Sequence, residues 1–167
     1  MVATSGARLL EENAVATLKS ELLPTADIVT PNIPEAELLA RSAITGRASL
    51  RETARRIFDE FGCTVLIKGG HALGDLALGE DTLFDGKNFT SLILPPIENP
   101  VSTHGTGCSL SAAIAAELTL GRNLTEAVSG AKKTVHEAIE NSYAVGRDCG
   151  VLGFTPNHQH LTTNNRQ

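Results

Sequence analysis

Ser102-Thr103-His104-Gly105-Thr106-Gly107-Cys108 is the stretch around which the chain is organised, and an alanine-rich run from Ser109 to Ala116 follows it directly. The run has strong helix propensity. Gly105 and Gly107 can take positive φ and let another molecule approach the backbone. Because the first helical turn leaves N–H groups unpaired at the positive end of the helix dipole, the stretch predicts an anion cradle. The alternative is a tight connection into a buried helix.

Cys108 lies where this loop becomes the helix. The positive, N-terminal end of a helix favours the thiolate form of a cysteine. An anion site and an acid or base are therefore expected within a few residues of one another. This combination suits phosphoryl transfer to the hydroxyl of a small molecule.

The elements expected before this stretch alternate between strands and helices. Such alternation favours a parallel sheet with crossover helices, because each parallel connection needs a crossover. Asp85-Gly86 between two apolar runs then predicts a β-hairpin, which makes the sheet mixed. The expected strands are 1–4, 27–30, 63–68, 81–84 and 88–94, and the expected helices are 11–23, 35–40, 109–120, one from about Asn123 to Tyr143, and one from a capping box at Ser49 to Gly62.

Polar residues follow two of the expected strands. Asn32-Ile33-Pro34-Glu35 places two polar side chains three residues apart, where both can face one site across the first turn of a helix. A carboxylate suits Mg²⁺ that is held through water beside nucleotide phosphates. The alternative is that Asn32 caps the helix and Glu35 complements its dipole. Ligands bind beyond the carboxyl ends of strands in doubly wound sheets, so this motif and the other candidate loops are expected to meet at one edge.

Lys68-Gly69-Gly70-His71 ends the strand expected at 63–68. A lysine is costly to bury on a central strand and is expected to emerge at its end. There it can neutralise the charge of nucleotide phosphates, or simply extend into solvent before a turn.

Composition limits the class of protein. The 167 residues are 41% hydrophobic, and the net charge is −5. One soluble α/β domain fits this length. No basic patch indicates a nucleic-acid partner, and no apolar run approaches the length that spans a membrane. Three cysteines without CxxC spacing favour reduced thiols in the cytoplasm.

Three ordered motifs resemble the hydroxymethylpyrimidine (phosphomethylpyrimidine) kinases of thiamine biosynthesis, which have the ribokinase-like fold. They are the stretches 30–35, 66–71 and 103–108, and the resemblance runs from Val2 to His160. It implies a three-layer αβα sandwich with a mostly parallel sheet and an added β-hairpin. Residues 1–160 are then the C-terminal portion of a kinase domain, and residues 161–167 are a flexible tail.

The resemblance also implies ATP and Mg²⁺ as cofactors and a pyrimidine alcohol as the substrate. Pyridoxal or pyridoxine is the nearest alternative acceptor, because some kinases of those substrates look like this family. By resemblance, Cys108 is the catalytic base or orients the acceptor hydroxyl. The other implied site residues are Gly105, Thr106 and Gly107 for phosphate, Lys68, Gly70 and Thr103 for ATP, and Asn32 and Glu35 near Mg²⁺, with no metal site built from protein ligands alone.

The resemblance begins partway into the family pattern, at an internal strand. The strands and pyrimidine contacts that precede it in the family are missing from this sequence, which predicts an N-terminally truncated domain. An uncovered sheet edge exposes apolar surface and favours pairing with a second copy or a complementing chain. The alternative to an active kinase is thus a non-catalytic fragment that keeps nucleotide or partner binding.

The remaining candidates have structural interpretations. Cys63 and Cys149 are expected as small core or boundary residues. Gly130 is expected to mark close packing of two helices, because glycine otherwise weakens a helix. His158 and His160 are expected in a polar tail.

Overall fold

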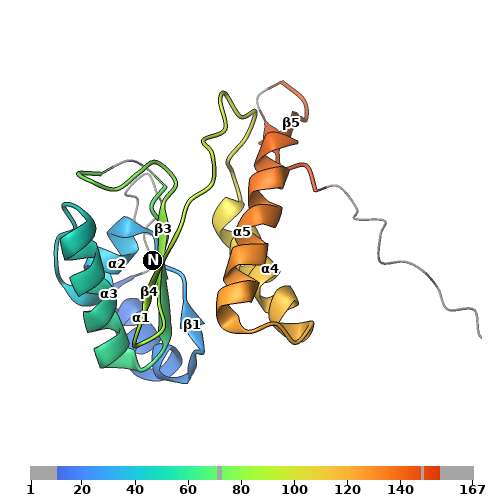
Figure 1. The fold of residues 1–167 in the computed structure, drawn as a ribbon. Coiled ribbons are helices and arrows are strands. Elements are labelled where there is room, and N and C mark those ends of the chain that lie inside the picture. Colours follow the sequence, from blue (N-terminus) through green and yellow to red (C-terminus); the bar gives the residue numbers. More distant parts are fainter. Residues whose placement is uncertain (1–10, 71–72, 148, 155–167) are drawn as a thin grey trace, which may run out of the picture. The chain divides into compact units, whose positions relative to one another are not determined.

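The computed structural model describes residues 11–70, 73–147 and 149–154 (Figure 1). The chain divides into two units, Met1–Pro96 and Ile97–Gln167, and each unit is described by itself. The strand expected at 1–4, His71, and the tail with His158 and His160 lie outside the described residues. Across the described ranges, no helix combines the length and apolar character needed to cross a bilayer.

A four-stranded sheet in the order β1-β2-β3-β4 forms the centre of the first unit. The first pair, β1 and β2, is parallel, whereas the other two pairs are antiparallel. The described part of the sheet is therefore mixed, with fewer parallel pairs than the expected mostly parallel sheet. The strands are β1 (Ile28–Val29), β2 (Thr64–Ile67), β3 (Asp81–Phe84) and β4 (Phe89–Leu92).

The hairpin predicted at Asp85-Gly86 connects β3 to β4, and the prediction is confirmed. Gly86 has a φ of +92°, which a glycine adopts without strain. The Asp85 carboxylate accepts the N–H groups of Asn88 and Lys87 at 2.7 and 2.8 Å. These bonds hold the pKa of Asp85 below its usual value, since they stabilise the charged form.

Helices cover one face of this sheet, with α2 and α3 beside the strands in Figure 1. The helix predicted at 11–23 is present, but it changes from α to π to 3₁₀ geometry, and its last turn includes Pro24 and ends at Thr25. The other two predicted helices are also present. The helical segments are α1 (Glu12–Thr17), η1 (Leu18–Leu22), η2 (Leu23–Thr25), α2 (Ile33–Ala40) and α3 (Arg47–Phe61).

The predicted start of α3 at Ser49 is wrong, because the helix begins two residues earlier. The Ser49 hydroxyl accepts the backbone N–H groups of Thr45 and Gly46 at 2.8 and 3.2 Å, so it closes the preceding turn. The Arg47 N–H binds the carboxylate of Asp75, which is 28 residues away in the sequence. The predicted end is confirmed, because Gly62 follows the helix with a φ of +75°.

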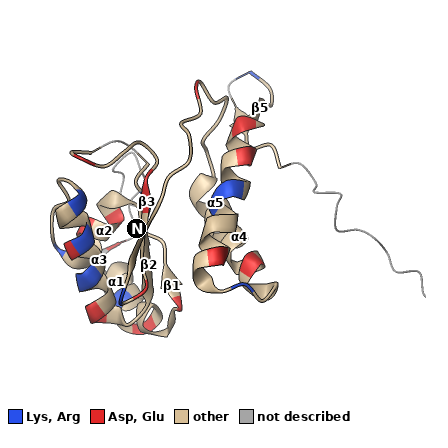
Figure 2. Cartoon of the chain, viewed as in Figure 1, with Lys and Arg blue, Asp and Glu red and all other residues tan. Residues whose placement is uncertain are grey.

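The core of the first unit lies between α2, α3 and the sheet. Residues at helical spacing on α3 face it, and Figure 2 shows basic and acidic residues at other positions along this helix. Phe58 is partly buried against this core and meets the Phe84 ring edge-on at 5.5 Å. The buried residues of α3 are Leu50, Thr53, Ala54, Ile57 and Phe61.

The second unit is a pair of helices, α4 (Thr106–Thr119) and α5 (Leu124–Glu140), followed by a two-stranded ribbon, β5 (Tyr143–Ala144) and β6 (Gly150–Val151). The predicted capping residue, Asn123, accepts the Glu126 N–H at 3.0 Å. The ribbon was not predicted, and α5 ends three residues before the expected Tyr143. The small residues on the buried face of α5 let α4 approach closely.

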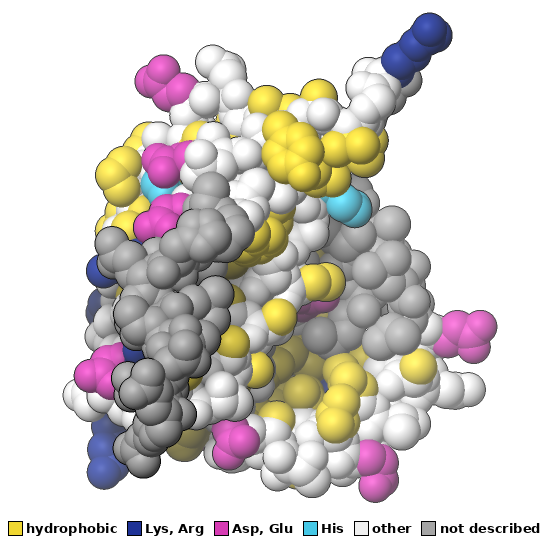
Figure 3. Space-filling view, turned by 90° about the vertical axis from the view of Figure 1, so that its right-hand side faces the viewer, with side chains coloured by type: hydrophobic (Ala, Val, Ile, Leu, Met, Phe, Trp, Pro, Cys, Tyr) yellow, Lys and Arg dark blue, Asp and Glu magenta, His cyan; other side chains and the backbone are white. Residues whose placement is uncertain are grey.

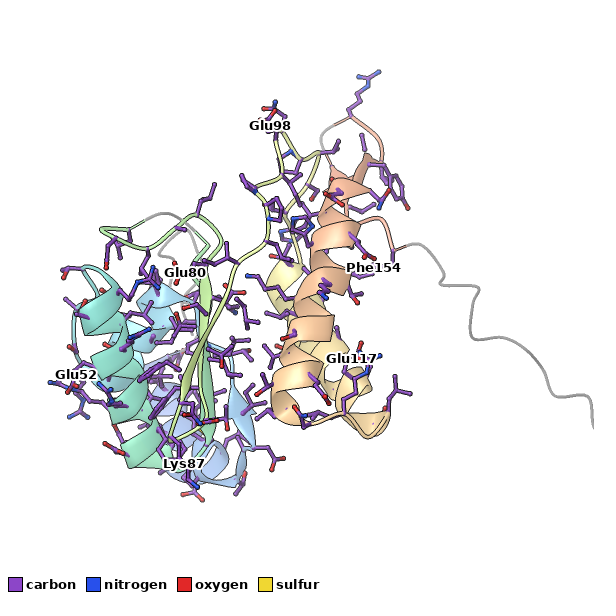
Figure 4. All side chains as sticks on the ribbon, viewed as in Figure 1. Glu52, Glu80, Lys87, Glu98, Glu117 and Phe154 are labelled. Atoms are coloured by element: carbon purple, nitrogen blue, oxygen red, sulfur yellow. The ribbon has the colours of Figure 1, made fainter. Side chains whose placement is uncertain are left out.

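Gly130 marks this close packing, as predicted. A Cβ at this position would lie 2.9 Å from the Arg122 guanidinium and 3.0 Å from the Glu117 carboxylate. These two side chains form an ion pair at 2.7 Å, and Glu117 is labelled on α4 in Figure 4. A side chain at position 130 would therefore displace the pair.

Among the residues that the structure describes, eight large apolar side chains are at least half exposed, and Figure 3 shows apolar atoms interrupting the polar surface on one face. They come from both units. Self-association of the chain stays a prediction that this exposure supports. The residues are Leu22, Leu78, Ile93, Val101, Leu120, Tyr143, Val145 and Phe154.

Candidate functional site

In the first unit, the ends of the parallel strands β1 and β2 place two of the predicted motifs side by side. Asn32 and Lys68 form a parallel bridge, and the Lys68 N–H donates to the Pro31 carbonyl at 2.9 Å. The two motifs are more than thirty residues apart in the sequence. The strand ends thus form one site edge that carries Asn32, Glu35, Lys68 and Gly70.

Asn32 and Glu35 form a reciprocal capping box at the start of α2. The Asn32 side chain accepts the Glu35 N–H at 2.8 Å, and Glu35 Oε2 accepts the Asn32 N–H at 3.0 Å. The capping interpretation is therefore confirmed. Among the described residues, Glu35 Oε1 has no hydrogen-bond or ion-pair partner, so this half-buried carboxylate keeps one oxygen for a water molecule or a cation.

Lys68 is half-buried at the end of β2, where the sequence predicted that it emerges. Gly70 is exposed with a φ of +52°, a conformation that suits glycine. Between them lies Gly69, which is buried and was not predicted as a site residue. A Cβ on Gly69 would lie 1.9 Å from the Glu80 carbonyl oxygen, so no other residue fits there.

In the second unit, Gly105 caps the N-terminus of α4 with a φ of +84°. Its carbonyl accepts the Ser109 N–H at 3.0 Å and closes the first turn. Within the described ranges, the N–H groups of Thr106, Gly107 and Cys108 have no partner, as is typical of a helix start that no side chain caps. The helix begins three residues before the predicted position, because Gly105 in the left-handed region sets its start.

Side-chain hydrogen bonds fix the loop that leads into this helix. The Ser102 hydroxyl accepts the His104 N–H at 3.1 Å, and the Ser142 hydroxyl accepts the Ser102 N–H at 3.2 Å. Thr103, a predicted ATP-binding residue, is exposed between them. The loop is thus anchored to the end of α5 while its outer surface stays open to solvent.

Cys108 is exposed in the first turn of α4, so its sulfur is accessible. Cys63 is buried as predicted, and burial raises the pKa of its thiol. The prediction that Cys149 is a core or boundary residue is wrong, because it is exposed beside β6. Cys108 and Cys149 are therefore both exposed, but only Cys108 lies at the start of a helix.

An ion pair between the half-buried Arg47 and the buried Glu80 lies next to the Lys68 segment, and nothing in the local sequence pattern identified it. Arg47 donates two hydrogen bonds to the Glu80 carboxylate, the longer of them 2.9 Å, and Glu80 is fully buried. The Arg47 hydrogen bonds hold the pKa of the Glu80 carboxyl below its usual value. In the part of the chain that the structure describes, no three His, Cys, Asp or Glu side chains converge as a metal site.

The family model and the curated relatives agree on one family. The family model described as phosphomethylpyrimidine kinase matches residues 1–153. The hydroxymethylpyrimidine/phosphomethylpyrimidine kinase of Haemophilus influenzae is 42% identical over 153 residues, which cover 90% of this chain and 56% of that protein. The chain spans about half the length of most of the curated relatives it matches.

Solved structures of kinases share the fold. The pyridoxal kinase of Staphylococcus aureus, also solved with AMP-PCP and pyridoxal, is 32% identical with a TM-score of 0.80 and covers 90% of this chain and 55% of its own. The phosphomethylpyrimidine kinase of Clostridium difficile is 34% identical with a TM-score of 0.68 over 83% of this chain and 54% of its own. These matches confirm the predicted ribokinase-like α/β fold.

Proposed function

Because the chain belongs to the phosphomethylpyrimidine kinase family, we propose that it forms the phosphate-handling portion of a cytoplasmic kinase that transfers the γ-phosphate of ATP to hydroxymethylpyrimidine or its monophosphate. The observation that carries the proposal is the exposed N-terminus of α4, with three unpaired N–H groups among the described residues and Cys108 in the same turn. Such a helix start attracts an anion through its N–H groups and its dipole.

In this proposal, the N–H groups of Thr106, Gly107 and Cys108 bind the transferring phosphoryl group and stabilise the charge that develops on it. Gly105 leaves the space beside the backbone open. The Cys108 thiolate accepts the proton of the acceptor hydroxyl or orients that hydroxyl. Both roles need the thiol to be accessible, and it is.

The strand-end edge of the first unit carries further residues that are proposed to contact a nucleotide. Lys68 and Gly70, together with Thr103 of the loop before α4, are the proposed ATP contacts. Asn32 and Glu35 would hold Mg²⁺ through water, using the Glu35 oxygen that the capping box leaves uncommitted. Bound Mg²⁺ neutralises phosphate charge during transfer.

Pyridoxal is a second candidate acceptor, favoured by the similarity to the pyridoxal kinase of Staphylococcus aureus. The acceptors are separated by a coupled ADP-release assay on the purified chain with hydroxymethylpyrimidine, its monophosphate and pyridoxal. The expected result is turnover with a pyrimidine, and MgATP binding by titration calorimetry with one site per chain. Binding without turnover would support a non-catalytic fragment, and a chain that does not bind MgATP would contradict the proposed function.

Gly105 and Gly121 provide a matched test of the anion cradle. They flank α4 with φ values of +84° and +80°, and a Cβ on either would have no described atom within 4 Å. Alanine at either position should destabilise the fold by about 1 kcal/mol, through left-handed strain alone. Only Gly105→Ala should weaken MgATP binding, by about tenfold, because only its Cβ enters the space that the phosphate approaches. Equal affinity of the two variants in calorimetry would show that this loop does not bind the nucleotide.

A further inference from the structure

Two consecutive carboxylates are buried where β3 begins. Glu80, labelled in Figure 4, is fully buried, and Asp81 is 8% exposed. A buried charge is costly unless hydrogen bonds or an opposite charge compensate it. Both carboxylates have partners that compensate their charge, and Asp81 binds different groups from those that Glu80 binds.

The Asp81 carboxylate accepts the N–H of Gly69 at 3.0 Å, in a buried setting. Gly69 is the residue between Lys68 and Gly70, which carry the proposed nucleotide contacts. On the other side of the same segment, the Pro31 carbonyl accepts the Lys68 N–H at 2.9 Å. The backbone on which Lys68 emerges is therefore held from both neighbouring segments.

Glu80 fixes the strand from which Asp81 reaches Gly69. Its carboxylate binds the Arg47 guanidinium and accepts the Ala77 N–H at 3.1 Å. Its carbonyl lies so close to Gly69 that a Cβ there would approach to 1.9 Å. The contact between β3 and the Lys68 segment is therefore closely packed, and a shift of either backbone would break the Asp81–Gly69 bond.

We infer that Asp81 is a positioning residue, whose carboxylate holds the Gly69 N–H and thereby sets where Lys68 meets the phosphates of a bound nucleotide. The inference rests on the proposed function for the ligand and on the described contacts for the positioning. The inference assigns Asp81 no direct contact with the nucleotide or the acceptor. It acts through the backbone of its neighbour.

The test compares Asp81→Ala with Asp81→Asn in the full chain. Asparagine keeps an oxygen that can accept the Gly69 N–H, whereas alanine removes the acceptor. Amide hydrogen exchange of Gly69 should accelerate at least tenfold in Asp81→Ala and change little in Asp81→Asn. MgATP affinity, measured by calorimetry, should fall about tenfold in the alanine variant and by less than about threefold in the asparagine variant.

Two control variants on the same strand separate positioning from general instability. Thr82→Val removes a buried hydroxyl that has no hydrogen-bond partner among the described residues, and Leu83→Ala opens a cavity away from Gly69. Both should keep MgATP affinity within about twofold at a temperature where they are folded. Lys68→Ala completes a double-mutant cycle with Asp81→Ala, and the double variant should bind MgATP no more weakly than Lys68→Ala alone.

The outcomes distinguish the inference from the proposed function. Unchanged Gly69 exchange in Asp81→Ala would overturn the inference whether or not the chain binds a nucleotide. Additive losses in the cycle would also overturn it, as would an asparagine variant that behaves like alanine. If the unmodified chain binds no MgATP but Gly69 exchange still accelerates in Asp81→Ala, the proposed function is overturned. The inference then loses its ligand and keeps only the positioning of the Lys68 backbone.

Discussion

Replacement of Cys108 by alanine is expected to lower the rate of phosphoryl transfer by about 10²- to 10⁴-fold, the usual contribution of a general acid or base. MgATP affinity should change by less than about twofold, because the backbone N–H groups that bind phosphate remain. The physical reason is the place of the sulfur, exposed in the first turn of α4 at the positive end of the helix. The measurement is a coupled ADP-release assay beside calorimetric titration with MgATP.

Cys149→Ala is the matched control, since Cys149 is exposed in the same unit but does not lie at a helix start. It should leave both turnover and affinity unchanged. A second measurement needs no acceptor: iodoacetamide should modify both exposed cysteines, and MgATP should slow only the reaction of Cys108. If MgATP protects both cysteines equally or neither of them, the phosphate does not bind beside Cys108.

Elements whose ends are determined by local chemistry were predictable from the sequence. The Asp85-Gly86 turn, the stop at Gly62 and the cap at Asn123 all depend on residues within a few positions of one another. The start of α3 was misplaced because its first N–H groups are satisfied partly by Asp75, far along the chain. A local capping pattern contains no information about such a partner.

The same division applies to the candidate site. The capping box of Asn32 and Glu35 and the helix start at the glycine loop follow from short motifs. The bridge between Asn32 and Lys68 followed only from the expectation that parallel strands end at one edge. Gly69 and its contacts with the start of β3 were missed, because they depend on the register of an antiparallel pair that no motif specifies.

Loss of the Arg47 side chain is expected to have the largest effect on stability. Arg47→Met leaves the fully buried Glu80 carboxylate without its guanidinium partner, so the melting temperature at pH 7 should fall by about 10 °C. Arg56→Met is the matched control on the same helix. Its partner Glu52 is 52% exposed, and the melting temperature should change by about 1 °C or less.

The pH dependence distinguishes a lost ion pair from lost packing. Arg47 lowers the pKa of Glu80 in the folded state, so the pair contributes stability above the unfolded-state pKa of a glutamate, and this contribution is lost as the pH falls through the lower folded-state value. The difference in melting temperature between the unmodified chain and Arg47→Met should therefore be largest near neutral pH and should narrow as the solution is acidified. A difference that stays constant down to strongly acidic pH would mean that Arg47 stabilises the fold through its aliphatic contacts and not through the charge of Glu80. In Arg47→Met/Glu80→Leu, where the uncompensated charge is also removed, part of the lost stability should return at neutral pH, because the desolvated carboxylate is then absent.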